Sequence, residues 1–271
     1  MTVKVLDLGY VTLIPKGCWG SDELVIESAR MSTNKGFEGW GPFSCEACIG
    51  VGYTENPLSD AVFSDEMCSK CRGSGQLPGD EKLLKYLWDH HHTSPFEMAG
   101  ATFEIYAPIF VIREWQRHRV QALHEGLSFN EMSGRYTELP DDYYTPSIER
   151  IKASKQSKTN KQGSAPAGEE GFSDHEALLI QERIGDIPKD CRAVYELLLD
   201  QGVAREVARL VLPVSQYSRL RASANLWGWL HFLKLRLDTS AQWEMREYAK
   251  AVSDIIKELF PRTHTLFSES L

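Results

Sequence analysis

Apolar residues recur along the chain with two different periods. Alternation, which is typical of strands, covers residues 3–14 and 101–107, and QYSRLRAS at 216–223 is compatible with it. Spacing of three and four residues, which is typical of helices, occurs in several longer segments: 21–32, 81–91, 107–119, 176–199, 203–211, 224–234 and 240–259. The helix over 21–32 is expected to begin at Ser21 or Asp22, which are good N-cap residues. The mixture predicts an α+β fold.

Two segments show neither period. Residues 35–80 are rich in Gly, Pro and Cys, and we expect them to form an insertion that a bound metal, rather than an apolar core, holds together. Residues 152–175 are poor in apolar side chains and predict a flexible linker. We expect a single domain over residues 1–271 that includes both segments.

Composition limits the classes of partner. The chain has 271 residues, 42% of them hydrophobic, and a net charge of −8. Bulk attraction to nucleic acid or to an anionic membrane is therefore not expected, and any phosphate site must be local. Residues 1–14 do not resemble a signal peptide, and no apolar run reaches the length of a membrane span. We expect a cytoplasmic protein, whose thiols stay reduced.

Four of the six cysteines form a paired motif. CEACIGVG and CSKCRGSG both match CxxCxGxG and supply Cys45, Cys48, Cys68 and Cys71. Four thiolates at this spacing suit a tetrahedral zinc ion, and the glycines allow tight turns that aim backbone N–H groups at the sulfurs. Redox dithiols or ordinary surface thiols are the alternatives. Because four thiolates leave no open coordination position, such a zinc would be structural.

Basic and polar residues gather in RHRVQALHEGLSFNEMSGRY, residues 117–136. Three adjacent basic groups repel one another unless an anion lies among them, so this stretch predicts a phosphate site; the alternative is a solvated helix end followed by a polar loop. Arg205, Arg209 and Arg236 add further basic groups in the C-terminal half. Arginine suits bidentate phosphate binding, so the residues alone predict a phosphorylated ligand.

The same stretch resembles a family signature. RHR followed by SFNEMSGRY resembles the motif of flavin-dependent thymidylate synthases. The resemblance extends in order through ARMS, HHTSPFE, APIFVIREWQRHR, REVARLVLP and LRLDTSAQWE, and it covers most of the chain apart from residues 35–80. It implies reductive methylation of dUMP to dTMP, with methylenetetrahydrofolate as carbon donor and FAD reduced by NADPH. It also implies a homotetramer with shared active sites, and we expect a central, mostly antiparallel sheet flanked by helices.

The resemblance assigns roles by position. It implies that FAD contacts Ser32, Ser94, Arg117, His118, Arg119, Glu131, Asn225, Trp227 and His231. It implies that dUMP contacts Glu114, Arg117, Glu131, Ser133, Gly134, Arg135, Arg209 and Arg236. The implied catalytic residues are Arg236, Ser133 and His92. Arg236 matches an arginine that favours the ionised form of uracil, and the pyrophosphate of FAD would relieve the repulsion within the basic trio.

Several positions depart from the family pattern. The segment between Arg119 and Ser133 carries about six extra residues, which we place around QALHEG. Glu114 stands where glutamine is common, and its carboxylate would repel phosphate unless an arginine pairs with it. Trp227 and His231 stand where the family often has Arg and Asn, and the cysteine-rich insertion is not part of the usual pattern.

These departures keep two alternatives open. The first is a related flavin- and folate-dependent methylase or hydroxymethylase of another pyrimidine nucleotide. The second is a non-catalytic zinc protein that binds nucleotides or nucleic acid.

Overall fold

The structure, a computed structural model, describes residues 1–54, 66–118, 127–158, 161–164 and 171–271. Its contacts divide the chain into two compact units. The sheet unit comprises Met1–Trp19 and Gly100–Glu258, and the second unit comprises Gly20–Ala99 and Leu259–Leu271. The single domain expected over 1–271 stays a prediction. Among the described residues, no helix combines the length and apolar character that a membrane span needs.

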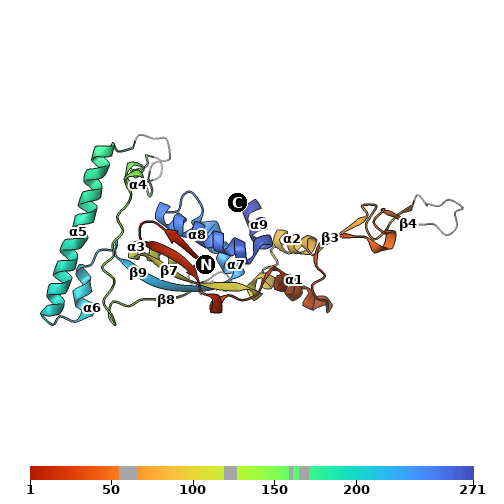
Figure 1. The fold of residues 1–271 in the computed structure, drawn as a ribbon, viewed down its shortest axis with the longest axis horizontal. Coiled ribbons are helices and arrows are strands. Elements are labelled where there is room, and N and C mark those ends of the chain that lie inside the picture. The colour runs from red at the N-terminus through yellow and green to blue at the C-terminus, as the bar shows by residue number, and fades with distance from the viewer. Residues whose placement is uncertain (55–65, 119–126, 159–160, 165–170) are drawn as a thin grey trace. The chain divides into compact units, whose positions relative to one another are not determined.

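The sheet unit is built on five strands (Figure 1). In spatial order they are β1 (Thr2–Val5), β2 (Gly9–Leu13), β7 (Gly100–Pro108), β9 (Tyr217–Asn225) and β8 (Ser128–Glu131). Each neighbouring pair is antiparallel. The expected antiparallel sheet is therefore confirmed, as are the strands expected at 101–107 and 216–223.

One face of the sheet carries the core. Alternate residues of β7 and β9, such as Phe103 and Leu220, are fully buried. Helices α7 (Leu226–Arg236) and α8 (Trp243–Leu259) cover the sheet (Figure 1). The Trp229 ring on α7 meets the Phe103 ring edge-on at 4.8 Å, and its Nε1 donates to the carbonyl of Ala101 at 2.9 Å. Such dry aromatic contacts fix α7, and with it Arg236, against the sheet.

The other helices described in the sheet unit are α3 (Ile109–Trp115), α4 (Ile148–Lys152), α5 (Asp174–Asp200) and α6 (Arg205–Ala208). Helices α3 and α5 fall on predicted helical segments, whereas α4 was not predicted. The helix expected over 203–211 is instead a short α6 followed by a 3-10 turn, Arg209–Val211. The cause is Pro213, because the residue before a proline avoids helical backbone, and Leu212 is extended.

The single strand expected over 3–14 is wrong. The segment is a hairpin of β1 and β2, with its turn at residues 6–8. The N–H of Leu8 donates to Asp7 Oδ1 at 2.9 Å, which is the local bond by which Asp favours turns. The apolar alternation shifts by one position in this turn, from Val5 to Leu6 and Leu8, and the prediction of one continuous strand overlooked that shift.

Two further elements were not expected. β8 contains alternating polar residues, which the edge of a sheet tolerates because, among the residues that the structure describes, β8 pairs with β9 alone. α9 (Pro261–Glu269) begins with proline at its first turn, and the buried Asp22 accepts the N–H of Arg262 at 2.8 Å. The proline is a start signal for a helix that the apolar period missed.

The second unit holds α1 (Asp22–Arg30) and α2 (Glu81–Asp89), both as expected. Ser21 caps α1 by accepting the N–H of Leu24 at 3.3 Å. Between these helices the insertion forms two small antiparallel ribbons, β3 (Trp40–Ser44) with β6 (Gln76–Gly79) and β4 (Tyr53–Thr54) with β5 (Glu66–Met67). We call residues 40–54 and 66–79 the cysteine module.

A buried carboxylate anchors the base of the cysteine module. Asp80 is fully buried, accepts the backbone N–H groups of Glu38 at 2.7 Å and Gly39 at 3.1 Å, and pairs with Arg30 on α1. The described part of the predicted linker, 152–175, is also hydrogen bonded, since Phe172 N–H donates to the Lys152 carbonyl at 3.2 Å. Residues 159–160 and 165–170 of that segment lie outside the described residues, and its flexibility stays a prediction.

Candidate functional site

Three predicted site residues meet where α3 and α7 end. Arg236 is the last residue of α7, and its Nε donates to His118 Nε2 at 2.8 Å. Its Nη1 donates to Glu114 Oε2 at 2.8 Å, and its Nη2 donates to the Glu114 carbonyl at 3.0 Å. We call these three residues the Arg236 cluster. The structure thus supplies the arginine that the Glu114 carboxylate was expected to need.

His118 is buried and uncharged at neutral pH. Its ring meets the Phe232 ring edge-on at 5.0 Å. Burial, with the positive charge of Arg236 and of His231, lowers the pKa of His118 to about 4. The basic trio of Arg117, His118 and Arg119 therefore carries fewer than three full charges. Arg117 is exposed, and Arg119 lies outside the described residues. The FAD contacts implied for the trio stay predictions.

Glu131 on β8 is the centre of a second group. Gln116 Nε2 donates to Glu131 Oε2 at 2.9 Å. Burial raises the pKa of the Glu131 carboxyl, and the positive charges of Arg113 and Arg209 act in the opposite direction. Arg113 was not among the predicted site residues. Its position one helical turn before Arg117 was the available signal.

The turn after β8 brings Gly134, Arg135 and Arg209 together. A Cβ atom at Gly134 would lie 3.3 Å from the Leu139 side chain and 3.4 Å from Arg209 Cδ, so the Arg209 side chain lies directly beside this turn. Ser133 Oγ accepts the N–H of Arg135 at 3.3 Å, and Arg135 Nε lies 3.6 Å from Glu206 Oε2. Two exposed arginines thus lie close to the glycine turn, which suits the phosphate of a nucleotide.

The start of α7 carries three residues implied for FAD. Asn225 caps the helix, since its Oδ1 accepts the N–H of Gly228 at 2.7 Å. Trp227 and His231 follow on the same helix. The capping bond explains why an asparagine suits position 225 structurally, and the cofactor roles of all three stay predictions.

The remaining predicted residues lie in the second unit. Ser32 Oγ donates to the Ala29 carbonyl at 3.0 Å, and Ser94 begins a 3-10 turn, Ser94–Met98. The His92 ring lies 5.7 Å from the Tyr86 ring. Each side chain is described within this unit, and the roles implied for it stay predictions.

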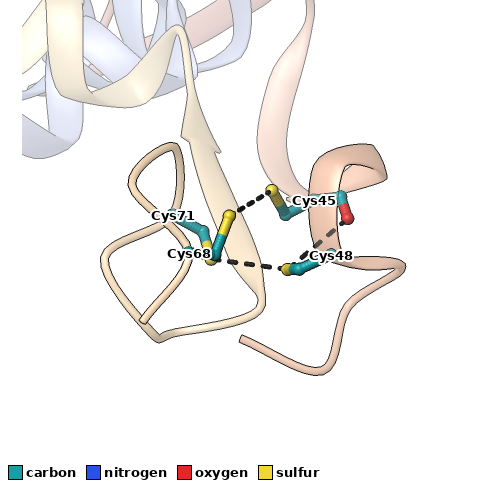
Figure 2. A group of neighbouring side chains, drawn as sticks. All are labelled: Cys45, Cys48, Cys68 and Cys71. Carbon is teal, nitrogen blue, oxygen red and sulfur yellow. Dashed lines mark hydrogen bonds between the residues drawn. The ribbon is translucent and has the colours of Figure 1, made fainter. Parts of the chain in front are cut away.

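The four motif cysteines form one cluster (Figure 2). Their sulfurs all lie within 4.8 Å of one another, with 3.9 Å between Cys45 and Cys68 and 3.6 Å between Cys48 and Cys71. A tetrahedral site with Zn–S bonds of about 2.3 Å requires sulfur separations of about 3.8 Å. Disulfide sulfurs would lie only about 2 Å apart. The geometry fits four thiolates around one zinc ion.

The two halves of the cysteine module exchange matching hydrogen bonds. Cys45 N–H donates to the Gly75 carbonyl at 2.9 Å, and Cys68 N–H donates to the Gly52 carbonyl at 2.8 Å. Gly52 and Gly75 have φ values of 88° and 70°, and a Cβ atom on either would come within 2.3 Å of a backbone oxygen of the other half. The motif needs glycine at these positions for both reasons.

Backbone donors also reach the sulfurs. Gly52 N–H donates to Cys48 Sγ at 3.2 Å. Burial raises the pKa of Cys48 to about 11. Burial also raises the pKa of Cys71, but the N–H of Gly75 and the neighbouring thiols outweigh it and bring the value to about 7. The expected role of the glycines, to aim N–H groups at sulfur, is confirmed for Cys48.

Comparisons with known proteins agree on one family. The family model described as thymidylate synthase complementing protein matches residues 18–262. A flavin-dependent thymidylate synthase from Thermus thermophilus is 36% identical over 271 residues, which is 100% of this chain and 80% of the relative. One from Thermotoga neapolitana is 37% identical over 98% of this chain and 94% of the relative.

A solved structure is similar over nearly the whole chain. It is a UMP/dUMP methylase, PolB, from Streptomyces cacaoi bound with 5-Br dUMP, with a TM-score of 0.70 and 28% identity. The similarity covers 98% of this chain and 97% of that one. The family resemblance predicted from the signature is confirmed, and the chain belongs to the flavin-dependent thymidylate synthase family of enzymes.

Proposed function

We propose that this enzyme methylates dUMP to dTMP, with methylenetetrahydrofolate as carbon donor and FAD reduced by NADPH. The observation that carries the proposal is the Arg236 cluster, which holds a guanidinium in fixed geometry in the same unit as the Gly134 turn and its two arginines. The similar methylase acts on UMP and dUMP and binds 5-Br dUMP, and the similar enzymes are named for flavin-dependent thymidylate synthesis.

The chain's own residues would bind and orient the substrate. Arg135 and Arg209 would take the phosphate, because exposed guanidinium groups beside a glycine turn suit its geometry. Arg236 would donate to the pyrimidine ring and stabilise negative charge that develops there. Ser133, beside the same turn, would help to place the nucleotide. The flavin, when bound, supplies the hydride that reduces the transferred carbon.

The cysteines support a route without a thiolate nucleophile. Four of the six are clustered for metal binding. Burial raises the pKa of Cys18, so it stays a thiol at neutral pH. Cys191 lies on the long helix α5, and it stands in no recognisable nucleophile motif. These cysteine environments fit a mechanism that depends on the flavin and on orientation of the substrate, without a cysteine nucleophile.

The cofactor set includes structural zinc held by Cys45, Cys48, Cys68 and Cys71. The sulfur separations support it, and four thiolates would leave the ion no open position for Lewis-acid chemistry. We place the enzyme in the cytoplasm, where its free thiols would stay reduced.

We propose a homotetramer whose active sites are shared between subunits. Helix α5 and the turn after α6 expose large apolar side chains, including Ile187 at 60%, Leu197 at 55% and Leu210 at 77%. Exposed apolar surface of this kind favours association with another copy. Size measurement in solution, by light scattering, checks this assignment, and a monomer that turned over dUMP would contradict it.

A second candidate is methylation or hydroxymethylation of another pyrimidine nucleotide. Glu114 favours this candidate, because a carboxylate can accept a hydrogen bond from the amino group of cytosine. Product analysis separates the candidates. The enzyme is incubated with FAD, NADPH, methylenetetrahydrofolate and either dUMP, UMP or dCMP, and products are identified by mass. We expect dTMP from dUMP; a product from dCMP alone would select the second candidate, and no product from any substrate would refute both.

A further inference from the structure

Arg30, the last residue of α1, links two features of the second unit. Its carbonyl oxygen accepts the Oγ1–H of Thr33 at 2.9 Å and the N–H of Lys35 at 3.2 Å, so it holds the turn that follows α1. Its guanidinium pairs with Asp80 and lies 2.7 Å from Glu38 Oε1. One residue therefore connects the turn after α1 with the base of the cysteine module.

The turn after α1, residues 31–33, carries Ser32, for which the family resemblance implies a contact with FAD. Ser32 and Met31 are exposed, so a ligand can reach them. The Oγ of Ser32 donates to the Ala29 carbonyl at 3.0 Å, and its position therefore depends on the fold of the turn. A cofactor that contacts Ser32 binds best when this turn already has its final shape.

Asp80 holds Arg30 through a buried carboxylate. It is fully buried and directly precedes α2, where Asp commonly caps a helix, yet among the described hydrogen bonds its side chain makes none to the start of α2. Oδ2 instead accepts the N–H groups of Glu38 at 2.7 Å and Gly39 at 3.1 Å, and Oδ1 pairs with Arg30. A buried carboxylate that lost these partners would be strongly destabilising. Glu38 and Gly39 must therefore stay in place for Asp80 to hold Arg30.

The ribbon of β3 and β6 joins this base to the cysteines. β3 begins at Trp40, directly after Gly39, and ends at Ser44, directly before Cys45. The four buried thiols have Leu77 as their packed apolar neighbour. Because that end of the ribbon has so little apolar core, we expect a bound metal to keep the ribbon and its base ordered.

We propose that Arg30 and Asp80 are positioning residues that couple zinc binding in the cysteine module to FAD binding at the turn after α1. In the metal-loaded module the ribbon keeps Glu38 and Gly39 on Asp80, and Asp80 keeps Arg30 and the turn in place. In the metal-free module the base loosens, and only a fraction of molecules has a turn that is competent for FAD. The measured affinity falls by that fraction. The inference rests on the proposed function, because it requires an enzyme that binds FAD.

Reciprocal titrations test this coupling without turnover. FAD affinity is measured by flavin fluorescence for the zinc-loaded enzyme and for enzyme stripped with a chelator. Zinc affinity is measured by competition with a chromogenic chelator, with and without FAD. We expect zinc to strengthen FAD binding by about tenfold and FAD to strengthen zinc binding by the same factor, because coupling between two binding sites is reciprocal. Equal FAD affinity with and without zinc would overturn the proposal.

Asp80→Asn separates the positioning pair from metal binding. The variant keeps the four clustered cysteines, so it should still take up zinc. Its FAD affinity should be about tenfold weaker than that of the zinc-loaded wild type and should no longer respond to zinc. Arg30→Lys keeps a positive charge for Asp80 but loses the planar fork, so it should retain part of the coupling. Wild-type coupling in Asp80→Asn would remove the pair from this role.

Asp89→Asn is the matched control, because it removes a carboxylate of α2 whose pair with Lys85, at 2.9 Å, is exposed. Its coupling should equal that of the wild type. Each protein is measured well below its melting temperature, so that a loss of stability alone leaves the ratio of affinities unchanged.

The wild type alone decides the matter if Asp80→Asn does not fold, since its affinities with and without zinc measure the coupling directly. FAD binding that ignored zinc would refute the coupling and leave the proposed function standing. An enzyme that bound FAD in neither state would refute the proposed function as well. An enzyme that took up no zinc would overturn the coupling together with the metal assignment.

Discussion

The four cysteines come from two stretches of four residues each, whereas His118 and Arg236 lie 118 residues apart and meet only because α3 and α7 end side by side. The cysteine module has a core of four thiols with Leu77 packed against it. The Arg236 cluster stands on a sheet and helices with an extensive apolar core. A metal would therefore stabilise the first region, and packing already stabilises the second.

The largest effect is expected from breaking the metal site. Cys48→Ser removes one of four ligands, so bound zinc should fall from about one per chain to none. Because the module has little apolar core, it should also become sensitive to protease between residues 35 and 80. Metal analysis and limited proteolysis measure both effects. Cys191→Ser, a thiol on α5, is the matched control and should keep the metal; zinc retained by Cys48→Ser would contradict the assignment.

A smaller effect is expected at the proposed phosphate contact. Arg209→Ala should raise the KM for dUMP by about 10- to 100-fold with little change in kcat, because a hydrogen bond to a charged group is worth about 1.5–3 kcal/mol. Steady-state kinetics measure this split. Arg205→Ala, also exposed and one turn earlier, should change KM by less than about twofold. Equal effects of the two substitutions would remove Arg209 from the site.

The basic trio gives a further test of the sheet unit. Arg117→Ala should weaken FAD binding by about tenfold, because it removes one charge-assisted contact to phosphate. Titration of the flavin-free enzyme with FAD, followed by flavin fluorescence, measures the change. Lys234→Ala, an exposed cation on α7, should leave FAD affinity as it is. An unchanged affinity for Arg117→Ala would end the phosphate role of this residue.

The last prediction concerns pH and stability. The pKa of His118 is about 4 when folded and near 6.5 when unfolded, so the unfolded chain binds more protons between these values. Stability should therefore fall as pH drops from about 6.5 to 4, by up to about 3 kcal/mol from this residue. Denaturant unfolding of the wild type and His118→Gln at pH 7 and 4.5 isolates the contribution. An identical loss in both proteins would show that His118 is not held neutral.

The contrast between the cysteine module and the Arg236 cluster also explains which features the sequence could predict. The cysteine site follows from local spacing, because CxxCxGxG fixes both the ligands and the positive-φ glycines near them. The signature residues were found from their resemblance, yet their pairing depends on where distant helices end. Nothing local to Glu114 indicates that Arg236 will contact it, and Arg113 joins Glu131 only through the placement of β8 beside β9.

The secondary structure also divides into elements that the local sequence predicts and elements that depend on contacts elsewhere in the chain. Helices with a strong apolar period, such as α2 and α5, were predicted near their true bounds. The hairpin at residues 2–13, the edge strand β8 and α9 depend on a turn, on strand pairing and on a cap from Asp22, none of which an apolar period records.

The central claim is that the chemistry depends on Arg236 in the sheet unit. The most direct test is dTMP formation in a single turnover at saturating dUMP, by the wild type and by Arg236→Ala, each loaded with FAD and zinc. We expect the variant to bind dUMP and to form dTMP about 10²–10³-fold more slowly, because the lost contact stabilises charge that develops on the ring. A variant that forms dTMP at the wild-type rate would contradict the account.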